Sequence, residues 1–256
     1  YMAAGLTDLF GDVPYFEAGM GKNEIYTPKY DTQVEIYADM VDQLKIQMEV
    51  LKGANSADAY PGQDPMYNND LDKWVRFANS FRLRLAMRAR FVQDTKSKYE
   101  GIIKECLGQP LIEEIDQNAG IEHADSENWE LHNPWYNKTK DYQAGTFQFS
   151  VSKKFVDWLV STSDPRLQAL VSPNPKGEYV GLPNGLVDIE IGKFTRSQFS
   201  VPGDLMLRPD QPLYIMCASE IWFLRAEAAL LVPGAGGDPA VLYQKGIEKG
   251  MERWGI

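Results

Sequence analysis

Residues 70–90 read DLDKWVRFANSFRLRLAMRAR, and this stretch decides the fold. Its large apolar residues recur three or four positions apart, which is the spacing of one face of an α-helix. These residues are Trp74, Phe77, Phe81 and Leu85. Asp70 or Asp72 can cap the first turn, because a carboxylate accepts hydrogen bonds from the free N–H groups there. The stretch therefore predicts a long amphipathic helix whose aromatic face is buried.

The opposite face of this predicted helix is rich in arginine, although the chain as a whole carries a net charge of -10. The arginines are Arg76, Arg82, Arg84, Arg88 and Arg90. A guanidinium group inside a fold needs carboxylates or carbonyl oxygens to accept its hydrogen bonds. We therefore expect neighbouring carboxylates or buried carbonyl oxygens within the protein to bind these arginines.

The same periodicity predicts further helices on both sides of residues 70–90. Their ranges are 32–52, 95–107, 151–161, 218–231 and 240–254. We expect Val34 to be buried in the first of them and Tyr243 in the last. The first 30 residues have Gly and Pro as punctuation and predict an ordered loop. Two pairs of helices joined by short connections favour tetratricopeptide-like hairpins, so the predicted fold class is mostly α with long irregular loop insertions.

Two long stretches, 110–147 and 172–212, lack helical periodicity and are predicted to be loops. The first is dense in aromatic and amide side chains, which suit the apolar faces and hydroxyl edges of sugars. The candidate ligand-binding residues are Trp129, Asn133, Trp135, Tyr136 and Tyr142. The alternative is that these rings anchor the loop against the helices, and we expect Trp135 and Tyr136 to be the more buried ones because they follow Pro134.

Several function classes are disfavoured by the sequence. The acidic composition argues against nucleic acid as a partner, and the common catalytic signatures are absent, so we expect a protein that is not an enzyme. The two cysteines have no metal-binding spacing, and the two histidines, His123 and His132, are expected at the surface. We expect no cofactor and no metal. The cluster Asp64, Asn68, Asp70 and Asp72 could suit calcium, but helix capping explains it better.

Four groups of residues in order carry a resemblance to a known family. They are Phe10 to Tyr15 with Glu17-Ala18 and Tyr30 to Gln33; Trp74 with Phe77 to Met87 and Arg88; Asp164-Pro165-Arg166; and Ala218 to Ala229 followed by Tyr243, Gly246-Ile247 and Met251 to Ile256. Read together, they resemble the SusD/RagB family of outer-membrane nutrient-binding lipoproteins. The motifs match scaffold positions, so the resemblance assigns no ligand contact.

The resemblance implies a helical scaffold held by an N-terminal lipid on the outer face of the outer membrane of a Gram-negative cell. It also implies a SusC-like TonB-dependent transporter as the partner, to which an oligosaccharide is passed without being cleaved. Peptide binding is the alternative within the family, and a helical-repeat adaptor or a carbohydrate-active enzyme are alternatives outside it.

The resemblance also bears on the extent of the chain. Members of the family are about twice as long, so we expect a fragment that lacks both ends and part of the ligand site. The chain begins at Tyr1 and holds no apolar run near the ~18 residues that would span a bilayer, so we expect a soluble piece. We predict one partial SusD-like domain over residues 1–256, with the scaffold at 32–107 and 218–256 and a loop-rich insertion at 110–212.

Overall fold

The structure is a computed structural model that describes residues 1–55, 62–137, 150–187 and 192–256. The chain folds into two units, which are described separately. Unit 1 consists of Tyr1–Ala119 and Met216–Glu248, and unit 2 of Gly120–Ile215 and Lys249–Ile256. The prediction of a mostly helical chain is confirmed, because helices dominate the regular structure of the described residues. The assignment of the whole chain to one domain stays a prediction.

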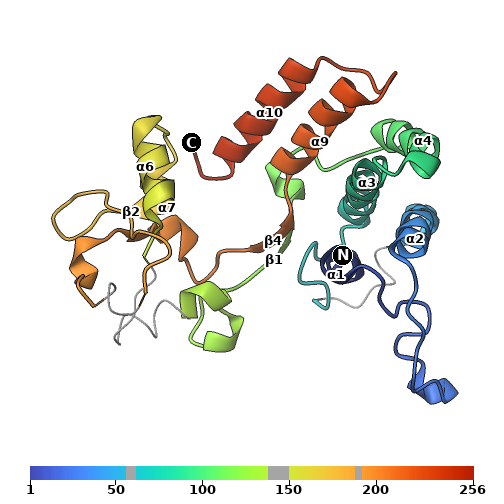
Figure 1. Cartoon of the computed structure of the whole chain (residues 1–256), viewed down its shortest axis with the longest axis horizontal. Coiled ribbons are helices and arrows are strands. Elements are labelled where there is room, and N and C mark those ends of the chain that lie inside the picture. The colour runs from blue at the N-terminus through green and yellow to red at the C-terminus, as the bar shows by residue number, and fades with distance from the viewer. Residues whose placement is uncertain (56–61, 138–149, 188–191) are drawn as a thin grey trace. The chain divides into compact units, whose positions relative to one another are not determined.

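Unit 1 is built from long helices and short 3-10 turns (Figure 1). The helices are α1 (Met2–Phe10), α2 (Gln33–Gly53), α3 (Leu71–Ala89), α4 (Lys96–Leu107), α9 (Ala218–Leu231) and α10 (Pro239–Glu252), of which α10 continues into unit 2 after Glu248. The turns are η1 (Met20–Asn23), η3 (Gln93–Thr95) and η4 (Ile115–Gln117). Helix α3 lies between α2 and α4 and also contacts α9, whereas α1 packs on α2. The tetratricopeptide-like stacking of hairpins stays a prediction.

Side-chain hydrogen bonds mark the starts of α2, α3 and α10. Thr32 and Glu35 form a capping box at the start of α2, in which each side chain accepts a hydrogen bond from the backbone N–H of the other residue. Asp70 caps α3 by accepting a hydrogen bond from the N–H of Lys73 over 3.0 Å. Asp238 does the same for α10, with the N–H of Ala240 at 2.8 Å. The predicted capping role of Asp70 is confirmed.

The core of unit 1 is centred on the second half of α3. Phe81 and Leu85 are buried as predicted, whereas Trp74 and Phe77 are only partly buried. Every residue from 78 to 87 is buried, because α2, α4 and α9 cover α3 on several sides. Periodicity could not identify this complete burial, since arginines interrupt the apolar pattern.

The arginines of α3 form bonds inside unit 1, as predicted. Arg82 donates from Nε to the carbonyl oxygen of Val41 and from Nη2 to Glu105, both over 3.0 Å. Arg84 makes a bidentate pair with Glu220 of α9, in which Nε lies 2.5 Å from Oε1. The others bond as follows: Arg76 to the carbonyl of Leu111, Arg88 to Asp8, and Arg90 to the carbonyl of Leu231. These bonds connect α3 to its neighbours, which supports its role as scaffold.

Three predictions about unit 1 are wrong. The first 30 residues contain α1 and η1 instead of only a loop. The apolar periodicity did not predict α1, because its large apolar side chains face outward and its buried residues are small or polar. The outward residues are Leu6, Leu9 and Phe10, and the buried ones are Ala4 and Thr7. Val34 is 52% exposed because it lies in the first turn of α2. Tyr243 is also exposed, because Leu242 and Gly246 are the residues of α10 that point inward.

A buried aspartate holds the segment before α2 in place. Asp31 pairs with Val13 through two backbone hydrogen bonds, and its side chain accepts hydrogen bonds from the N–H groups of Phe16 at 2.8 Å and Tyr15 at 3.0 Å. The hydrogen bond from Phe16 is the largest cause that lowers the pKa of Asp31, and the neighbouring Lys29 adds to it. The folded segment is therefore stabilised by the ionised form of Asp31.

Unit 2 has short elements around a small apolar core. Its helices are α6 (Lys153–Ser161) and α7 (Leu167–Leu170), its strands β1 (Ala119–Ile121), β2 (Val171–Ser172), β3 (Val201–Pro202) and β4 (Leu213–Met216), and its turns η5 (Trp129–Leu131), η6 (Arg196–Gln198) and η7 (Asp204–Met206). Strand β1 pairs with β4, and β2 pairs antiparallel with β3. Val156, Leu159, Leu170 and Val171 form the core, against which Trp254 packs.

The chain leaves and re-enters unit 1 at two neighbouring points. The side-chain oxygen of Asn118 accepts a hydrogen bond of 2.7 Å from the N–H of Ala218, and both residues are buried. These residues are 100 positions apart in the sequence. The larger segment of unit 2, residues 120–215, is therefore inserted between two points of the helical unit that are held together.

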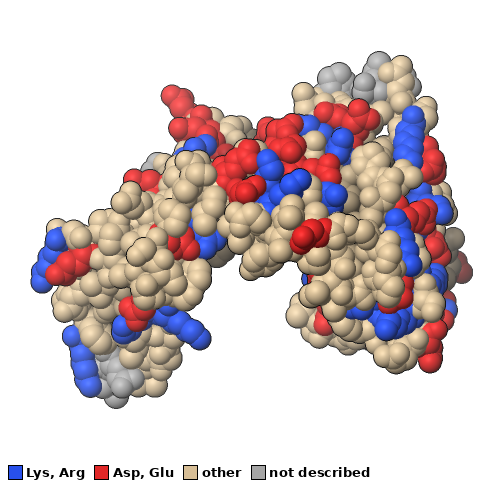
Figure 2. Space-filling model, turned by 90° about the horizontal axis from the view of Figure 1, so that it is seen from above, with Lys and Arg blue, Asp and Glu red and all other residues tan. Residues whose placement is uncertain are grey.

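Charged side chains of both signs are distributed over the surface. Figure 2 shows Lys and Arg side chains mostly interspersed with Asp and Glu on the face that it presents. Across the described ranges, none of the helices is both apolar enough and long enough to cross a lipid bilayer.

Candidate functional site

The predicted aromatic loop begins with a tight local structure in unit 2. Turn η5 starts at Asn128, whose side-chain oxygen accepts a hydrogen bond of 3.1 Å from the N–H of Glu130. The hydroxyl of Ser126 accepts a hydrogen bond from the N–H of Asn128 and donates one to its carbonyl oxygen. These short-range bonds explain why Trp129 lies in a turn and not in a strand.

His132 organises the loop from inside, so the expectation of a surface histidine is wrong for this residue. It is buried, with Nε2 at 2.7 Å from the carbonyl oxygen of Ser126 and Nδ1 at 3.1 Å from Oδ1 of Asn137. Asn137 in turn donates to the carbonyl oxygen of Trp129 over 2.8 Å. The ring of Tyr136 packs edge-on against His132. His132 and Asn137 thus close the loop on itself.

Asn133 attaches the loop to the segment before β4. Its backbone N–H donates to the carbonyl oxygen of Pro209, and its side-chain Nδ2 donates to that of Gln211, both over 2.7 Å. Its side-chain oxygen accepts the N–H of Trp135 over 2.8 Å. Asn133 is buried, so its side chain holds the loop in position and has both polar atoms engaged.

Among the described residues of the loop, the two tryptophans are the most exposed large hydrophobic side chains. Trp129 is 66% exposed and Trp135 is 58% exposed. The expectation that Trp135 is buried is therefore wrong: residues 134–137 are helical, and Asn133 directs the chain so that the indole lies at the surface. Tyr136 is half-buried against His132. Tyr142 lies outside the described residues.

This arrangement suits stacking against a ligand with an apolar face. A tryptophan ring offers a large rigid surface at low cost in conformational entropy, and the hydrogen bonds of His132 and Asn133 hold the backbone on either side of both rings. Glu127, Asn128 and Glu130 are exposed in the same segment and can accept or donate hydrogen bonds. The loop therefore combines apolar platforms with polar groups nearby.

Two features of unit 2 were missed by the sequence analysis. Trp158 of α6 is half-exposed, and the guanidinium group of Arg166, which is fixed by Asp164, lies 5.9 Å from its ring centre. The helical spacing of Trp158 from the buried Val156 and Leu159 could have shown that it points outward. The second is the turn Arg208–Gln211, whose carbonyl oxygens hold Asn133; no local signal in the sequence connects these two segments.

The acidic cluster before α3 serves the scaffold. The side chain of Asp64 accepts hydrogen bonds from Trp74 Nε1 at 2.7 Å and from three backbone N–H groups. Burial alone would raise the pKa of Asp64, but these hydrogen bonds outweigh it and leave the pKa below its usual value. Within the part of the chain that the structure describes, no group of three or more His, Cys, Asp or Glu residues is arranged to hold a metal ion.

The described chain is a set of packed helices with an inserted segment that presents aromatic side chains. The whole chain, residues 1–256, matches the SusD-like family described as "Starch-binding associating with outer membrane", and the chain belongs to this family. This description is that of a family of binding proteins, not of enzymes.

Solved structures of similar proteins support the fold. A SusD homologue from Bacteroides uniformis is 27% identical with a TM-score of 0.81, and the match covers 100% of this chain and 51% of that one. A chitin-binding SusD homologue from Flavobacterium johnsoniae is 26% identical with a TM-score of 0.79, and the match covers 98% and 50%. The chain thus spans about half the length of these relatives. No curated protein matches it.

Proposed function

We propose that this protein binds an oligosaccharide through Trp129 and Trp135 at the cell surface, without cleaving it. The observation that supports this most is the exposure of both indole rings on a loop whose backbone is fixed by His132, Asn133 and Asn137. A contiguous exposed apolar surface often marks a binding site. The family description as starch-binding, and a chitin-binding relative, favour a glycan as the ligand.

Each residue of the loop has a distinct role in this proposal. Trp129 and Trp135 stack against the C–H faces of sugar rings, and Tyr136 contributes its partly exposed edge. Tyr142 stays a proposed contact from the sequence alone. Asn133 is a positioning residue, since its side chain bonds to Gln211 and Trp135. Unlike a ligand contact, it acts by keeping the indole of Trp135 at the surface.

Calorimetric titration of the full-length protein tests this proposal. The ligands are maltoheptaose, chitohexaose and a short unstructured peptide, because peptide binding is the alternative within the family. We expect one of the glycans to bind, and Trp129→Ala and Trp135→Ala each to weaken it roughly 30-fold, since tryptophan hot spots contribute about 2 kcal/mol or more. Tyr26→Ala is the control, because Tyr26 is an equally exposed ring of unit 1.

Other outcomes would contradict the proposal. Binding of the peptide alone would replace the glycan with a peptide ligand. Release of shorter sugars during the titration would indicate an enzyme. Glycan binding that survives both tryptophan substitutions would place the site elsewhere.

The proposed setting is the outer membrane, with a lipid anchor upstream of this chain and a SusC-like TonB-dependent transporter as partner. The family description, which associates its members with the outer membrane, supports this setting. Affinity purification of the tagged full-length protein from solubilised outer membranes should recover a TonB-dependent transporter. Recovery of cytosolic proteins without a transporter would favour a helical-repeat adaptor instead.

A further inference from the structure

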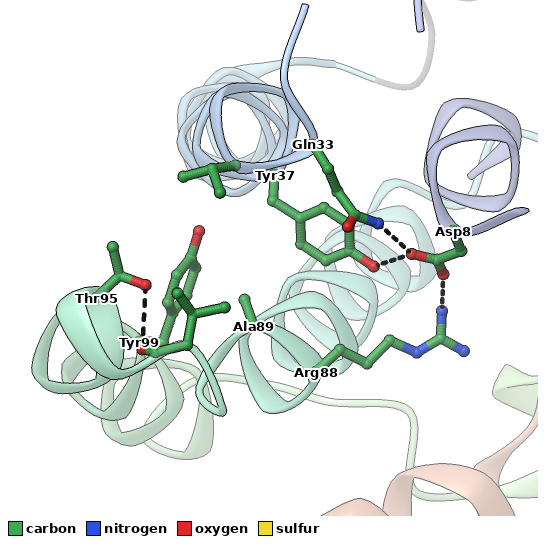
Figure 3. A pocket seen from close by; sticks show the side chains of 9 residues that line it. Asp8, Gln33, Tyr37, Arg88, Ala89, Thr95 and Tyr99 are labelled. Carbon is green, nitrogen blue, oxygen red and sulfur yellow. Dashed lines mark hydrogen bonds and ion pairs between the residues drawn. The ribbon is translucent and has the colours of Figure 1, made fainter. Parts of the chain in front are cut away.

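A cavity of about 290 Å³ lies within unit 1, away from the aromatic loop in sequence. It is bounded by residues of α1, α2, the end of α3, the η3 turn and α4, and Figure 3 shows its lining side chains. Ligand-binding pockets usually measure about 300–1,000 Å³, so this cavity is suited to a ligand of one ring. Its apolar surface comes from Val34, Ala89 and Val92 and from the rings of Tyr37 and Tyr99.

One side of the cavity carries a polar network centred on Asp8. Its Oδ1 accepts hydrogen bonds from the hydroxyl of Tyr37 at 2.6 Å and from Nε2 of Gln33 at 3.3 Å, and its Oδ2 pairs with Arg88 at 2.5 Å. The charges of Asp8 and Arg88 compensate each other. Burial, followed by the hydrogen bond to Asp8, raises the pKa of Tyr37 to about 12, so this tyrosine stays a donor at neutral pH. The wall therefore suits a neutral ligand.

The cavity also contains polar atoms that the described part of the chain leaves without a partner. Tyr99 is 2% exposed, and its hydroxyl forms no hydrogen bond with any described residue. Burial, and then the charge of Asp42, raise its pKa, so the hydroxyl carries its proton. Gln33 uses its amide nitrogen for Asp8 and for the carbonyl of Thr7, while its amide oxygen accepts no hydrogen bond from the described residues.

We propose that this cavity is a second binding site and that it takes one neutral pyranose ring. The choice of a sugar rests on the glycan-binding function proposed above. A pyranose has apolar C–H faces for the tyrosine rings and valines, and hydroxyl groups for the Tyr99 hydroxyl, the Gln33 oxygen and the free N–H groups of Arg88. A purely apolar ligand would displace water from these polar atoms without replacing its hydrogen bonds, which is costly.

Monosaccharide titrations followed by NMR test the second site. The protein is the full-length chain with Trp129→Ala and Trp135→Ala, so that the aromatic loop cannot contribute, and the probes are glucose and N-acetylglucosamine. We expect one of them to bind with a Kd on the order of 1 mM, because a ligand of one ring has few atoms. The substitution Val34→Trp should weaken binding at least 10-fold, because the larger ring fills the cavity.

A matched variant separates this effect from a general change in α2. Val50→Trp makes the same substitution on the same helix, at a valine that is 60% exposed and lies outside the cavity lining, and should leave the Kd within about twofold. Tyr99→Phe removes only the hydroxyl and should weaken binding about three- to tenfold, which corresponds to one hydrogen bond. If Val34→Trp does not fold, Val92→Trp fills the cavity from the η3 turn.

Two results would overturn the second site. One is the absence of binding by either monosaccharide. The other is binding that Val34→Trp and Tyr99→Phe leave unchanged. Both results are independent of the oligosaccharide titration in which Trp129 and Trp135 are intact, so failure here and failure of the proposed function can be distinguished.

Discussion

Truncating Phe81 to alanine tests the arrangement of α3 at the centre of unit 1. The ring is 4% exposed, it stacks on Phe77 with ring centres 6.2 Å apart, and it contacts the ring of Tyr1 at 5.6 Å. Removing roughly 150 Å² of buried apolar surface at about 25 cal/mol per Å² costs about 4 kcal/mol. This figure lies within the range of ~3–5 kcal/mol found for phenylalanine truncations in cores.

Urea unfolding of the full-length protein, followed by the circular dichroism of its helices, measures this loss. Phe81→Leu keeps most of the volume and should cost about 1–1.5 kcal/mol. Phe91→Ala is the control, because Phe91 is 65% exposed and contacts only the guanidinium group of Arg90 in the ring contacts of the described chain. It should cost no more than about 1 kcal/mol. A free energy of unfolding for Phe81→Ala within 1 kcal/mol of the unmodified protein would refute the central placement of α3.

Three further predictions concern stability and the loop. Gly181→Ala should lower the free energy of unfolding by roughly 1–3 kcal/mol, because the added Cβ would lie 2.4 Å from the backbone of Lys153. Gly101→Ala on the open face of α4 should instead raise the free energy of unfolding by about 0.5–1 kcal/mol. Equal melting temperatures for the two variants would contradict both expectations. Asn133→Ala should speed amide exchange in residues 129–136 and weaken glycan binding together, and an unchanged exchange rate would show that Asn133 does not hold the loop. Asp31 has a lowered pKa in the fold, so its contribution to the free energy of unfolding is present above the unfolded pKa of about 3.9 and is lost as pH falls through the folded pKa. Asp31→Asn should therefore flatten the acid side of the curve of stability against pH.

The helices of unit 1 could be predicted because their signals are local. Asp70 at the start of α3, and the buried residues Tyr99 and Ile103 of α4, lie within a few positions of the bonds and contacts that define each element. Helix α1 was missed because it is short, contains Gly5 and presents much of its apolar surface outward. Its position depends on contacts with α2, which begins more than 20 residues later.

The candidate site was predictable in location but not in detail. Aromatic density identified the segment around Trp129, and composition alone could do so. The exposure of Trp135 depends on Asn133, whose side chain bonds to Gln211, 78 positions away. The burial of His132 depends on the carbonyl of Ser126 and the side chain of Asn137, which a polar composition does not reveal. Such bonds are set by the fold as a whole.

The hydrogen bond between Asn118 and Ala218 has a consequence for how proteins of this architecture can diversify. It closes a loop of about 100 residues at its base, and the entropy of loop closure changes slowly with length, by only about 0.6 kcal/mol for each doubling. The intervening segment can therefore lengthen, shorten or be exchanged between homologues with little penalty for the helices that hold its two ends. New ligand preferences can arise by replacing this segment as a cassette, while the helical framework keeps its sequence.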